Sequence, residues 1–283
     1  MVSELVVSLG YRCNFSCAHC CVSDKKETRL SREELELIPR TINEYKIKSL
    51  LFIGGEPTLY IPDINHILSK VRTDPEVRIT TNGHFAKSRS AAESVLSSIL
   101  RLSGVNLSYD SFHARFMPMA KVKALYSACK EKGLDLLVLS ALRSPLDLVF
   151  VKKFQEVGKI QVKIQKLLPY GNAKKNNIGF RYPSFDKRVL SRYCPNKDRI
   201  IYLCGEGFTS CCSSLVFDCN SRRFFGPTLK GYLKSNFYKL ISKKTFGEMR
   251  RDFKLDDLAF SPEHSSPCGI CAFLFKNKYG AKL

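Results

Sequence analysis

Three cysteines near the N-terminus are the residues best placed to do chemistry. Cys13, Cys17 and Cys20 are spaced CxxxCxxC and directly follow the apolar stretch from Leu5 to Leu9. Three thiolates on one loop can bind three corners of a cubane iron–sulfur cluster and leave the fourth iron without a protein ligand. An open coordination position allows chemistry, whereas a fully ligated metal site is structural. A zinc site is the alternative, although zinc usually takes paired CxxC cysteines.

A glycine-rich turn follows the next apolar stretch of the chain. Gly54, Gly55, Glu56 and Pro57 come directly after residues 49–53. Glycine lets a backbone approach a ligand closely, and the Glu56 carboxylate can accept hydrogen bonds from an ammonium group. A Gly-Gly pair alone would indicate an ordinary turn, but its position downstream of CxxxCxxC favours ligand binding.

Together these two motifs resemble the signature of the radical S-adenosylmethionine (SAM) superfamily. The resemblance implies a [4Fe–4S] cluster whose open iron binds the amino and carboxylate groups of SAM. It also implies that residues 54–57 hold the methionine amino group. In the family the reduced cluster cleaves SAM to a 5′-deoxyadenosyl radical, which abstracts hydrogen from the substrate. An electron donor such as flavodoxin or ferredoxin is then required.

Strands and helices that would position these motifs alternate over the first 170 residues. Near-continuous apolar runs indicate buried parallel strands, and the segments between them indicate helices. The predicted strands cover residues 5–9, 49–53, 77–81, 105–109, 134–139 and 160–168, and the predicted helices cover 31–46, 61–71, 88–102, 114–132 and 146–157. Six such units are fewer than the eight of a complete barrel. They agree with the partial (β/α)6 barrel that the resemblance implies, although periodicity alone equally allows an open doubly wound sheet.

A break in the pattern near residue 170 divides the chain. We expect an α/β radical SAM partial barrel over residues 1–170. A small cysteine-rich subdomain, similar to the Twitch and SPASM extensions of the family, is expected over residues 171–283. Its helix candidates are residues 236–243 and 245–253.

Polar residues at the ends of the later strands extend the resemblance. Ser108 and Asp110 end the fourth strand, where family members commonly contact the SAM ribose. Arg143 follows the fifth, where a guanidinium suits the SAM carboxylate. His19 is expected beside the adenine. Asp110 and His113 are candidate catalytic residues, as a base or proton relay, although each of these polar residues has an ordinary structural role as its alternative.

Residues at the end of the third strand are further candidates for contacts with SAM. They are Thr80, Thr81 and Asn82.

A second set of cysteines lies in the C-terminal part. Cys194 is followed by twelve residues, Gly207, four residues and Cys212, and Cys268 and Cys271 form a CxxC pair. This spacing resembles the auxiliary-cluster region of Twitch and SPASM proteins. Four thiolates close a cubane completely, and the predicted ligands of one auxiliary [4Fe–4S] cluster are Cys194, Cys212, Cys268 and Cys271.

The spacing leaves two alternatives open for this auxiliary site: one ligand and the type of metal. Cys211 is an alternative to Cys212, and a structural zinc site is an alternative to iron–sulfur. A two-cluster SPASM domain needs further cysteines after the CxxC pair, so the one-cluster Twitch arrangement fits better. Cys204 and Cys219 are left over, and Cys21 is expected to be a bystander.

The formal net charge of +20 is concentrated in the C-terminal half. Residues 1–150 hold 20 Lys/Arg and 16 Asp/Glu, a balance of +4, whereas residues 151–283 hold 26 and 10, a balance of +16. The asymmetry favours an acidic peptide or an anionic small molecule as partner. A basic surface that only confers solubility is the alternative, and anionic clusters balance part of the charge.

The sequence also bears on the compartment. No apolar run approaches the ~20 residues of a membrane span, and the N-terminus lacks the basic region of a signal peptide. We expect a cytoplasmic protein without membrane contact. There the twelve cysteines stay reduced and available as metal ligands.

The combined prediction is a radical SAM oxidoreductase that oxidises or cross-links a ribosomally made peptide or protein, as Twitch and SPASM relatives often do. A small-molecule radical SAM dehydrogenase is the first alternative, because the one-cluster layout resembles one. An RNA-modifying enzyme is the second, since basic charge suits phosphate, although no RRM, KH or OB pattern is visible. The Gly-Gly-Glu-Pro turn disfavours a non-catalytic iron–sulfur sensor.

Overall fold

The centre of the molecule is an eight-stranded sheet with the strand order β6-β5-β4-β3-β2-β1-β7-β8. In this computed structural model, residues 2–22, 28–217 and 222–280 are described. The strands are β1 (Glu4–Ser8), β2 (Ser49–Ile53), β3 (Glu76–Thr81), β4 (Leu102–Ser108), β5 (Asp135–Leu142), β6 (Gln161–Lys166), β7 (Arg199–Leu203) and β8 (Gly207–Thr209). Neighbouring strands are parallel except for β7 and β8, which are antiparallel.

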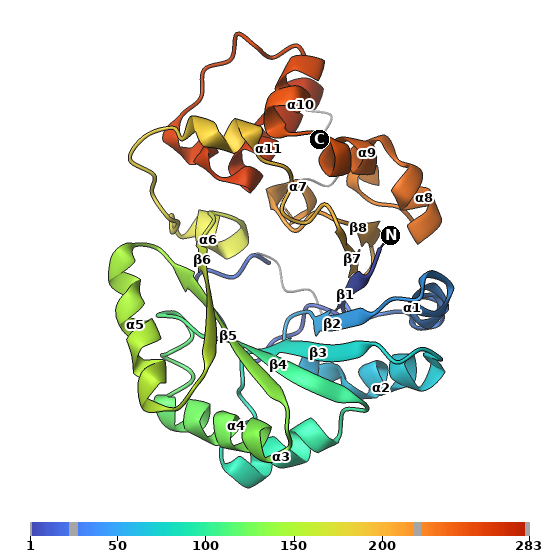
Figure 1. Cartoon of the computed structure of the whole chain (residues 1–283), viewed down its shortest axis with the longest axis vertical. Helices are drawn as coiled ribbons and strands as arrows, with labels where there is room; N and C mark the ends of the chain where they lie inside the picture. The colour runs from blue at the N-terminus through green and yellow to red at the C-terminus, as the bar shows by residue number, and fades with distance from the viewer. Residues whose placement is uncertain (1, 23–27, 218–221, 281–283) are drawn as a thin grey trace.

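Helices connect the successive parallel strands and cover the outside of the curved sheet (Figure 1). They are α1 (Arg32–Tyr45), α2 (Ile61–Lys70), α3 (Arg89–Ser97), α4 (Met119–Glu131) and α5 (Leu148–Lys152), with the 3-10 turns η1 (Pro57–Tyr60), η2 (Pro145–Asp147) and η3 (Lys153–Glu156). Local sequence sets their ends: Ser31 and Glu34 form a capping box at the start of α1, and Ser88 caps α3.

The two faces of the sheet differ in burial. On β5, Leu136 and Val138 are buried in the main apolar core, which includes Val122 and Leu125 of α4. The alternate β5 residue Leu139 faces the inside of the curve and is only half-buried. On β5, the side chains inside the curve are thus less fully covered than those that face the helices. In barrel enzymes the site lies at the carboxyl ends of the strands.

The C-terminal part packs against β7 and β8. Its helices are α6 (Gly171–Lys175), α7 (Ser214–Phe217), α8 (Leu229–Lys234), α9 (Asn236–Lys243), α10 (Phe246–Asp252) and α11 (Pro267–Tyr279), with the 3-10 turns η4 (Lys187–Ser191), η5 (Arg222–Phe224) and η6 (Pro262–Ser265). Phe275 of α11 has edge-to-face contacts with Phe224, Phe237 and Phe253. These contacts bring together helices that are far apart in the sequence.

The predicted partial barrel is confirmed. Helices cover one face of a sheet whose first six strands are in sequential order, whereas a doubly wound sheet would have helices on both faces. The helix predicted over 88–102 is wrong at its C-terminal end, because α3 stops at Ser97 and β4 begins at Leu102. The helix predicted from residue 114 begins at Met119, after Pro118.

The C-terminal part differs from the sequence prediction in its strands and agrees with it in two helices. Strand β7 pairs with β1, so residues after the expected boundary at 170/171 contribute to the same sheet. The helices expected at residues 236–243 and 245–253 correspond to α9 and α10. None of the helices in the described part of the chain is long and apolar enough to cross a membrane.

Candidate active site

The CxxxCxxC cysteines lie on the loop after β1, at the carboxyl edge of the sheet. Cys17 is buried, and Cys13 and Cys20 are partly buried. Within this loop the Cys20 N–H donates to the Cys17 carbonyl at 3.2 Å. The Arg12 N–H donates to the Tyr60 hydroxyl of η1 at 2.9 Å, so the loop is fastened to the turn after β2. Metal ligands on one fastened loop keep a fixed spacing.

The turn after β2 packs backbone to backbone against the cysteine loop. The Gly55 N–H donates to the Gly10 carbonyl at 2.8 Å, and the Glu56 N–H donates to the Arg12 carbonyl at 2.9 Å. A Cβ atom on Gly55 would lie 2.1 Å from the Arg12 carbonyl oxygen. Glycine is therefore required here because the turn approaches the cysteine loop closely, and not only because it would approach a ligand.

The Glu56 carboxylate is buried at the centre of a hydrogen-bond network. Oε1 accepts from the Thr58 hydroxyl at 2.7 Å and the Thr81 hydroxyl at 2.6 Å, and Oε2 accepts from the Asn82 N–H at 2.8 Å. Burial raises the pKa of Glu56, whereas these hydrogen bonds lower it. Glu56 thus joins the ends of β2 and β3, and Pro57, which is buried, begins η1 directly after it.

Asn82 continues this network to the cysteine loop. Its amide nitrogen donates to Asn14 Oδ1 at 2.7 Å and lies 3.7 Å from Cys13 Sγ. The signal in the sequence was its position at the end of the third strand, where Thr81 also contacts Glu56. Asn82 is therefore the residue that links the β3 end to the first predicted cluster ligand.

A second network surrounds Asp110 at the end of β4. The Asp110 carboxylate lies 2.9 Å from His113 Nδ1 and 3.3 Å from His19 Nε2. Burial would raise the pKa of Asp110, but the hydrogen bonds to His113 and His19 hold it well below its usual range. One ring nitrogen from each histidine and one carboxylate oxygen of Asp110 lie within 4.8 Å of one another. The structure therefore joins the cysteine loop to the β4 end.

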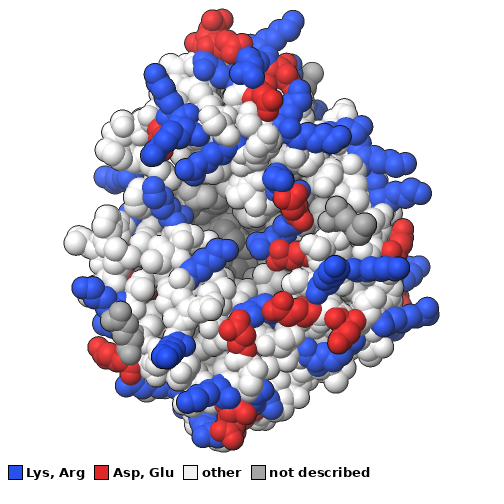
Figure 2. Space-filling view, viewed as in Figure 1, with Lys and Arg blue, Asp and Glu red and all other residues white. Residues whose placement is uncertain are grey.

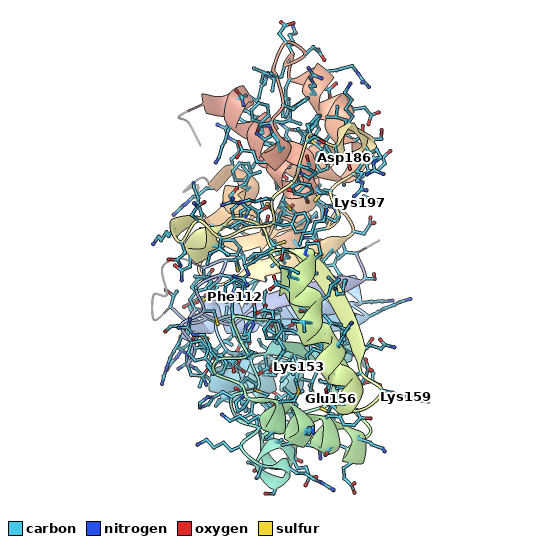
Figure 3. The ribbon with its side chains drawn as sticks, turned by 90° about the vertical axis from the view of Figure 1, so that its left-hand side faces the viewer. Phe112, Lys153, Glu156, Lys159, Asp186 and Lys197 are labelled. Carbon is cyan, nitrogen blue, oxygen red and sulfur yellow. The ribbon has the colours of Figure 1, made fainter. Side chains whose placement is uncertain are left out.

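Phe112 and Arg143 complete this side of the site. The Phe112 ring stacks on the His19 ring at 4.4 Å between centroids, and the Arg143 guanidinium carbon lies 5.1 Å from the Phe112 centroid. Arg143 is also paired with Asp147 at 3.2 Å, which lowers the pKa of Asp147 against the effect of its burial. Figure 3 labels Phe112 on this side of the molecule.

The predicted SAM-contact residues thus lie at the carboxyl ends of the parallel strands. Ser108, the last residue of β4, is half-buried and pairs with Leu139 of β5. The His19 ring contacts Phe112 and Asp110, and its buried Nδ1 atom has no hydrogen-bond partner among the described residues. Contact of His19 with adenine stays a prediction, as do the catalytic roles of Asp110 and His113.

Five thiols from separate segments of the C-terminal part form the second group. They belong to Cys194, Cys211, Cys212, Cys268 and Cys271. Burial raises the pKa of Cys194 to about 11 and that of Cys211 to about 12. Burial also raises the pKa of Cys271, and the nearby thiols that raise it further belong to Cys211, Cys194 and Cys268. Cys212 acts in the same way on Cys268 and is itself exposed.

Residues 170–172 connect the two cysteine groups. The Asn172 N–H donates to the Cys20 carbonyl at 2.9 Å. A Cβ atom on Gly171, whose φ is +51°, would lie 2.2 Å from the Cys21 carbonyl oxygen. The preceding Tyr170 faces the second group: burial raises the pKa of Tyr170, and Cys268 raises it further. The two sites are therefore neighbours.

The remaining cysteines differ in position. Cys204 is buried after β7, and Cys129 is buried on α4. Cys21 lies between the two groups, since a hydrogen bond with Cys20 raises its pKa and the Cys212 thiol acts in the same direction. Cys21 was predicted to be a bystander, but its thiol lies near one cysteine of each group. Cys219 lies outside the described residues.

The residues present fit the two clusters and SAM. Three thiols on one loop suit a cubane with an open iron, and five clustered thiols exceed the four that close a second one. The buried His19 Nδ1 atom, which no described residue hydrogen-bonds, offers a hydrogen-bonding group at the first site. Buried thiols of raised pKa become good ligands once a metal deprotonates them.

Comparisons with known proteins agree with this geometry. A family profile described as "Radical SAM superfamily" matches residues 7–165. The YydG protein of Bacillus subtilis (strain 168), whose name assigns it to peptide biosynthesis, is 26% identical over 297 residues, covering 96% of this chain and 91% of YydG. A GTP 3′,8-cyclase of Mycobacterium bovis is 28% identical over 199 residues, covering 63% of this chain and 54% of the cyclase.

Solved structures share the fold at low sequence identity. Streptococcus suis SuiB bound to precursor peptide SuiA has a TM-score of 0.61 at 15% identity, covering 85% of this chain and 66% of SuiB. Native anSMEcpe with bound AdoMet and Cp18Cys peptide has a TM-score of 0.60 at 15% identity, covering 97% of each chain.

Proposed function

Because this chain belongs to the radical SAM superfamily, we propose that it is a peptide-modifying enzyme with an auxiliary iron–sulfur cluster. The observation that carries the proposal is the second group of thiols, which residues 170–172 hold beside the first site. The relationship to YydG over nearly the whole chain supports a peptide substrate. The peptides bound in the structures of SuiB and anSMEcpe support it further.

At the first site, Cys13, Cys17 and Cys20 would hold the family's [4Fe–4S] cluster. When bound, the cluster and SAM supply a carbon-centred radical that takes a hydrogen atom from the substrate. Glu56 and Asn82 keep the cysteine loop in register with the ends of β2 and β3.

The groups around Asp110 would line the SAM pocket of this site. His19, Phe112 and Arg143 stack on one another there. The Arg143 guanidinium, which is paired with Asp147 in this structure, would bind the SAM carboxylate. His113, held by Asp110, is positioned to move a proton.

At the second site, we assign Cys194, Cys211, Cys268 and Cys271 as the auxiliary ligands. We place Cys211 rather than Cys212 in this set because Cys211 is buried and because its thiol is among those that raise the pKa of Cys271. The exposed Cys212 thiol raises the pKa of Cys194 and of Cys268 rather than that of Cys271, so the iron content of Cys211 and Cys212 variants decides between the two ligands. Cys212 is then the fifth thiol, which binds no cluster in this proposal. It is exposed and lies close enough to Cys21 to raise the pKa of that thiol.

The fifth thiol makes two reaction outcomes testable. In the first, which the sequence favours, the substrate radical gives one electron to the second site and loses a proton, so the peptide is oxidised or cross-linked. In the second, the Cys212 S–H would return a hydrogen atom to the carbon radical, so the peptide would be changed without net oxidation. The Cys212 thiyl radical left behind would take one electron from the reductant and one proton from solvent to restore the thiol. The presence of a fifth thiol supports keeping this second outcome.

Anaerobic reconstitution with iron, sulfide, dithionite and SAM tests the proposal. The test peptide is the product of a short acidic reading frame, where one is found beside the gene. Mass spectrometry in deuterated water distinguishes the outcomes, because oxidation removes two hydrogens whereas hydrogen return replaces one carbon-bound hydrogen with deuterium. Formation of 5′-deoxyadenosine without any change in the peptide would reject the peptide substrate and favour a small molecule.

A further inference from the structure

The two edges of the sheet are finished differently. At one edge, all three residues of β8 are buried, and Phe208 exchanges backbone hydrogen bonds of 2.9 Å with Gly226. At the other edge, five residues of β6 are exposed and Val162 is half-buried. Strands of parallel sheets are normally buried on both faces, and an open edge strand offers unpaired backbone groups to another chain.

The backbone of β6 presents hydrogen-bonding groups to this open edge. Within the described part of the chain, β6 pairs with β5 alone. The Leu167 N–H donates to the Leu142 carbonyl of β5 at 2.9 Å. Because backbone groups alternate along a strand, the N–H and C=O groups of Val162, Ile164 and Lys166 point away from β5.

The open edge leads into the candidate active site. Leu167, directly after β6, is buried in a small apolar cluster with Phe112 and Ala141. Ala18 of the cysteine loop packs against this cluster. A chain paired along β6 would therefore reach the first site at the end of the strand. The Phe180 N–H donates to the Leu167 carbonyl at 2.7 Å, so this chain covers the edge only beyond the strand end.

The charges around β6 select the occupant. Residues 151–168 contain five lysines and one glutamate. Lys153, Lys159 and Glu156 lie near the start of the strand (Figure 3). Near its end, the Lys166 ammonium lies 4.4 Å from the ring centroids of both Phe180 and Tyr182. Lys and Arg also outnumber Asp and Glu on the face shown in Figure 2.

We propose that the open edge of β6 binds the substrate peptide as an added strand, with acidic peptide side chains on the face of β6 that carries Ile164 and Lys166. The inference rests on the proposed peptide-modifying function. In strand addition, main-chain hydrogen bonds supply affinity and alternate side chains supply specificity. The geometry delivers the peptide to the carboxyl end of the sheet, where Cys17 and Phe112 lie.

Hydrogen–deuterium exchange on the reconstituted enzyme tests the binding mode. The probe is a ten-residue peptide of alternating glutamate and valine, and the control peptide has lysine in place of glutamate. We expect the glutamate peptide to slow exchange at Val162, Ile164 and Lys166. No slowing at these amides, or equal slowing by the lysine peptide, would overturn the proposal.

Two substitutions test the edge by fluorescence anisotropy with the same probe. Ile164→Pro removes one outward N–H, and proline is tolerated on edge strands; we expect binding to weaken about fivefold to tenfold. Lys166→Glu should weaken binding by a similar factor without a proline in the strand. Lys239→Glu on α9 is the matched charge reversal and should leave binding unchanged. Unchanged binding by Lys166→Glu, or equal weakening by Lys239→Glu, would contradict the proposal.

The proposed function and the edge fail in different ways. If wild type makes 5′-deoxyadenosine but never alters the peptide from the neighbouring reading frame, the proposed function fails. If wild type alters that peptide and Lys166→Glu does so with the same KM, the peptide does not use the β6 edge.

Discussion

The two cysteine groups differ in how the chain assembles them. Cys13, Cys17 and Cys20 share one loop after β1, and the turn at Gly55 fastens that loop through backbone hydrogen bonds. The second group is collected from three separate segments, which β7, β8 and α11 bring together. The first group thus depends on one local backbone contact, whereas the second depends on the packing of the whole C-terminal part. This difference predicts different responses to mutation.

The largest effect is expected from replacing the first group. The triple variant Cys13→Ala, Cys17→Ala and Cys20→Ala should retain about four iron atoms per chain rather than about eight. It should lose SAM cleavage completely, because no site for the open iron remains. Iron analysis and chromatography of 5′-deoxyadenosine check this. SAM cleavage by the triple variant at the wild-type rate would show that the radical does not originate at the first cysteine group.

Gly55→Ala should damage the first site through its backbone. The added Cβ would lie 2.1 Å from the Arg12 carbonyl, so the cysteine loop must move. We expect a loss of about 1–3 kcal/mol in the free energy of unfolding and at least about a tenfold loss in the rate of SAM cleavage.

A matched glycine substitution provides the control. Gly231→Ala on α8 meets only the Thr228 hydroxyl, at 3.1 Å, and should leave both quantities near wild type. Equal behaviour of Gly55→Ala and Gly231→Ala in urea titration and in SAM cleavage would refute a tight contact between turn and loop.

Adjacent cysteines in the second group should behave differently. Cys211→Ala should lose the auxiliary iron, because the buried Cys211 thiol lies with Cys194, Cys268 and Cys271. Cys212→Ala should keep about eight iron atoms per chain but change the peptide product. Iron analysis with electron paramagnetic resonance separates the two variants. Loss of iron in Cys212→Ala alone would restore the ligand set expected from spacing.

The smallest effect concerns the dependence of stability on pH. The pKa of Asp110 in the fold lies below its ordinary value of 3.8. The stability that Asp110 contributes is therefore fully present above that value and is lost as the pH falls through the folded pKa. Asp110→Asn should cost about 1–3 kcal/mol at pH 7, and the difference from wild type should shrink below about pH 4. Urea midpoints at pH 7 and pH 3.5 measure this, and an equal difference at both would contradict it.

The same contrast explains what the sequence could predict. The CxxxCxxC loop and the Gly-Gly-Glu-Pro turn are local patterns, and apolar runs revealed the six strands of the partial barrel. Strand β7 was missed although Arg199–Leu203 is mostly apolar, because its partner β1 lies far away in the sequence. Spacing leaves the choice between Cys211 and Cys212 open, and our proposal of Cys211 draws on its burial, which one residue of spacing does not encode.

Contacts between side chains from different strand ends were also beyond the sequence. Placement of Asp110 after β4 was predictable, but its bonds to both His19 and His113 required the folded chain. The role of Asn82 in joining Glu56 to Cys13 likewise needed the sheet order.

The central claim is that the first cysteine group cleaves SAM and the second group is needed to form the peptide product. The variant Cys268→Ala tests this claim most directly. The variant and wild type are reconstituted in parallel with dithionite, SAM and peptide, and 5′-deoxyadenosine and modified peptide are both measured. We predict that Cys268→Ala still cleaves SAM but leaves the peptide unmodified. Normal peptide product from this variant, or loss of SAM cleavage while the first cluster is intact, would contradict separate roles for the two sites.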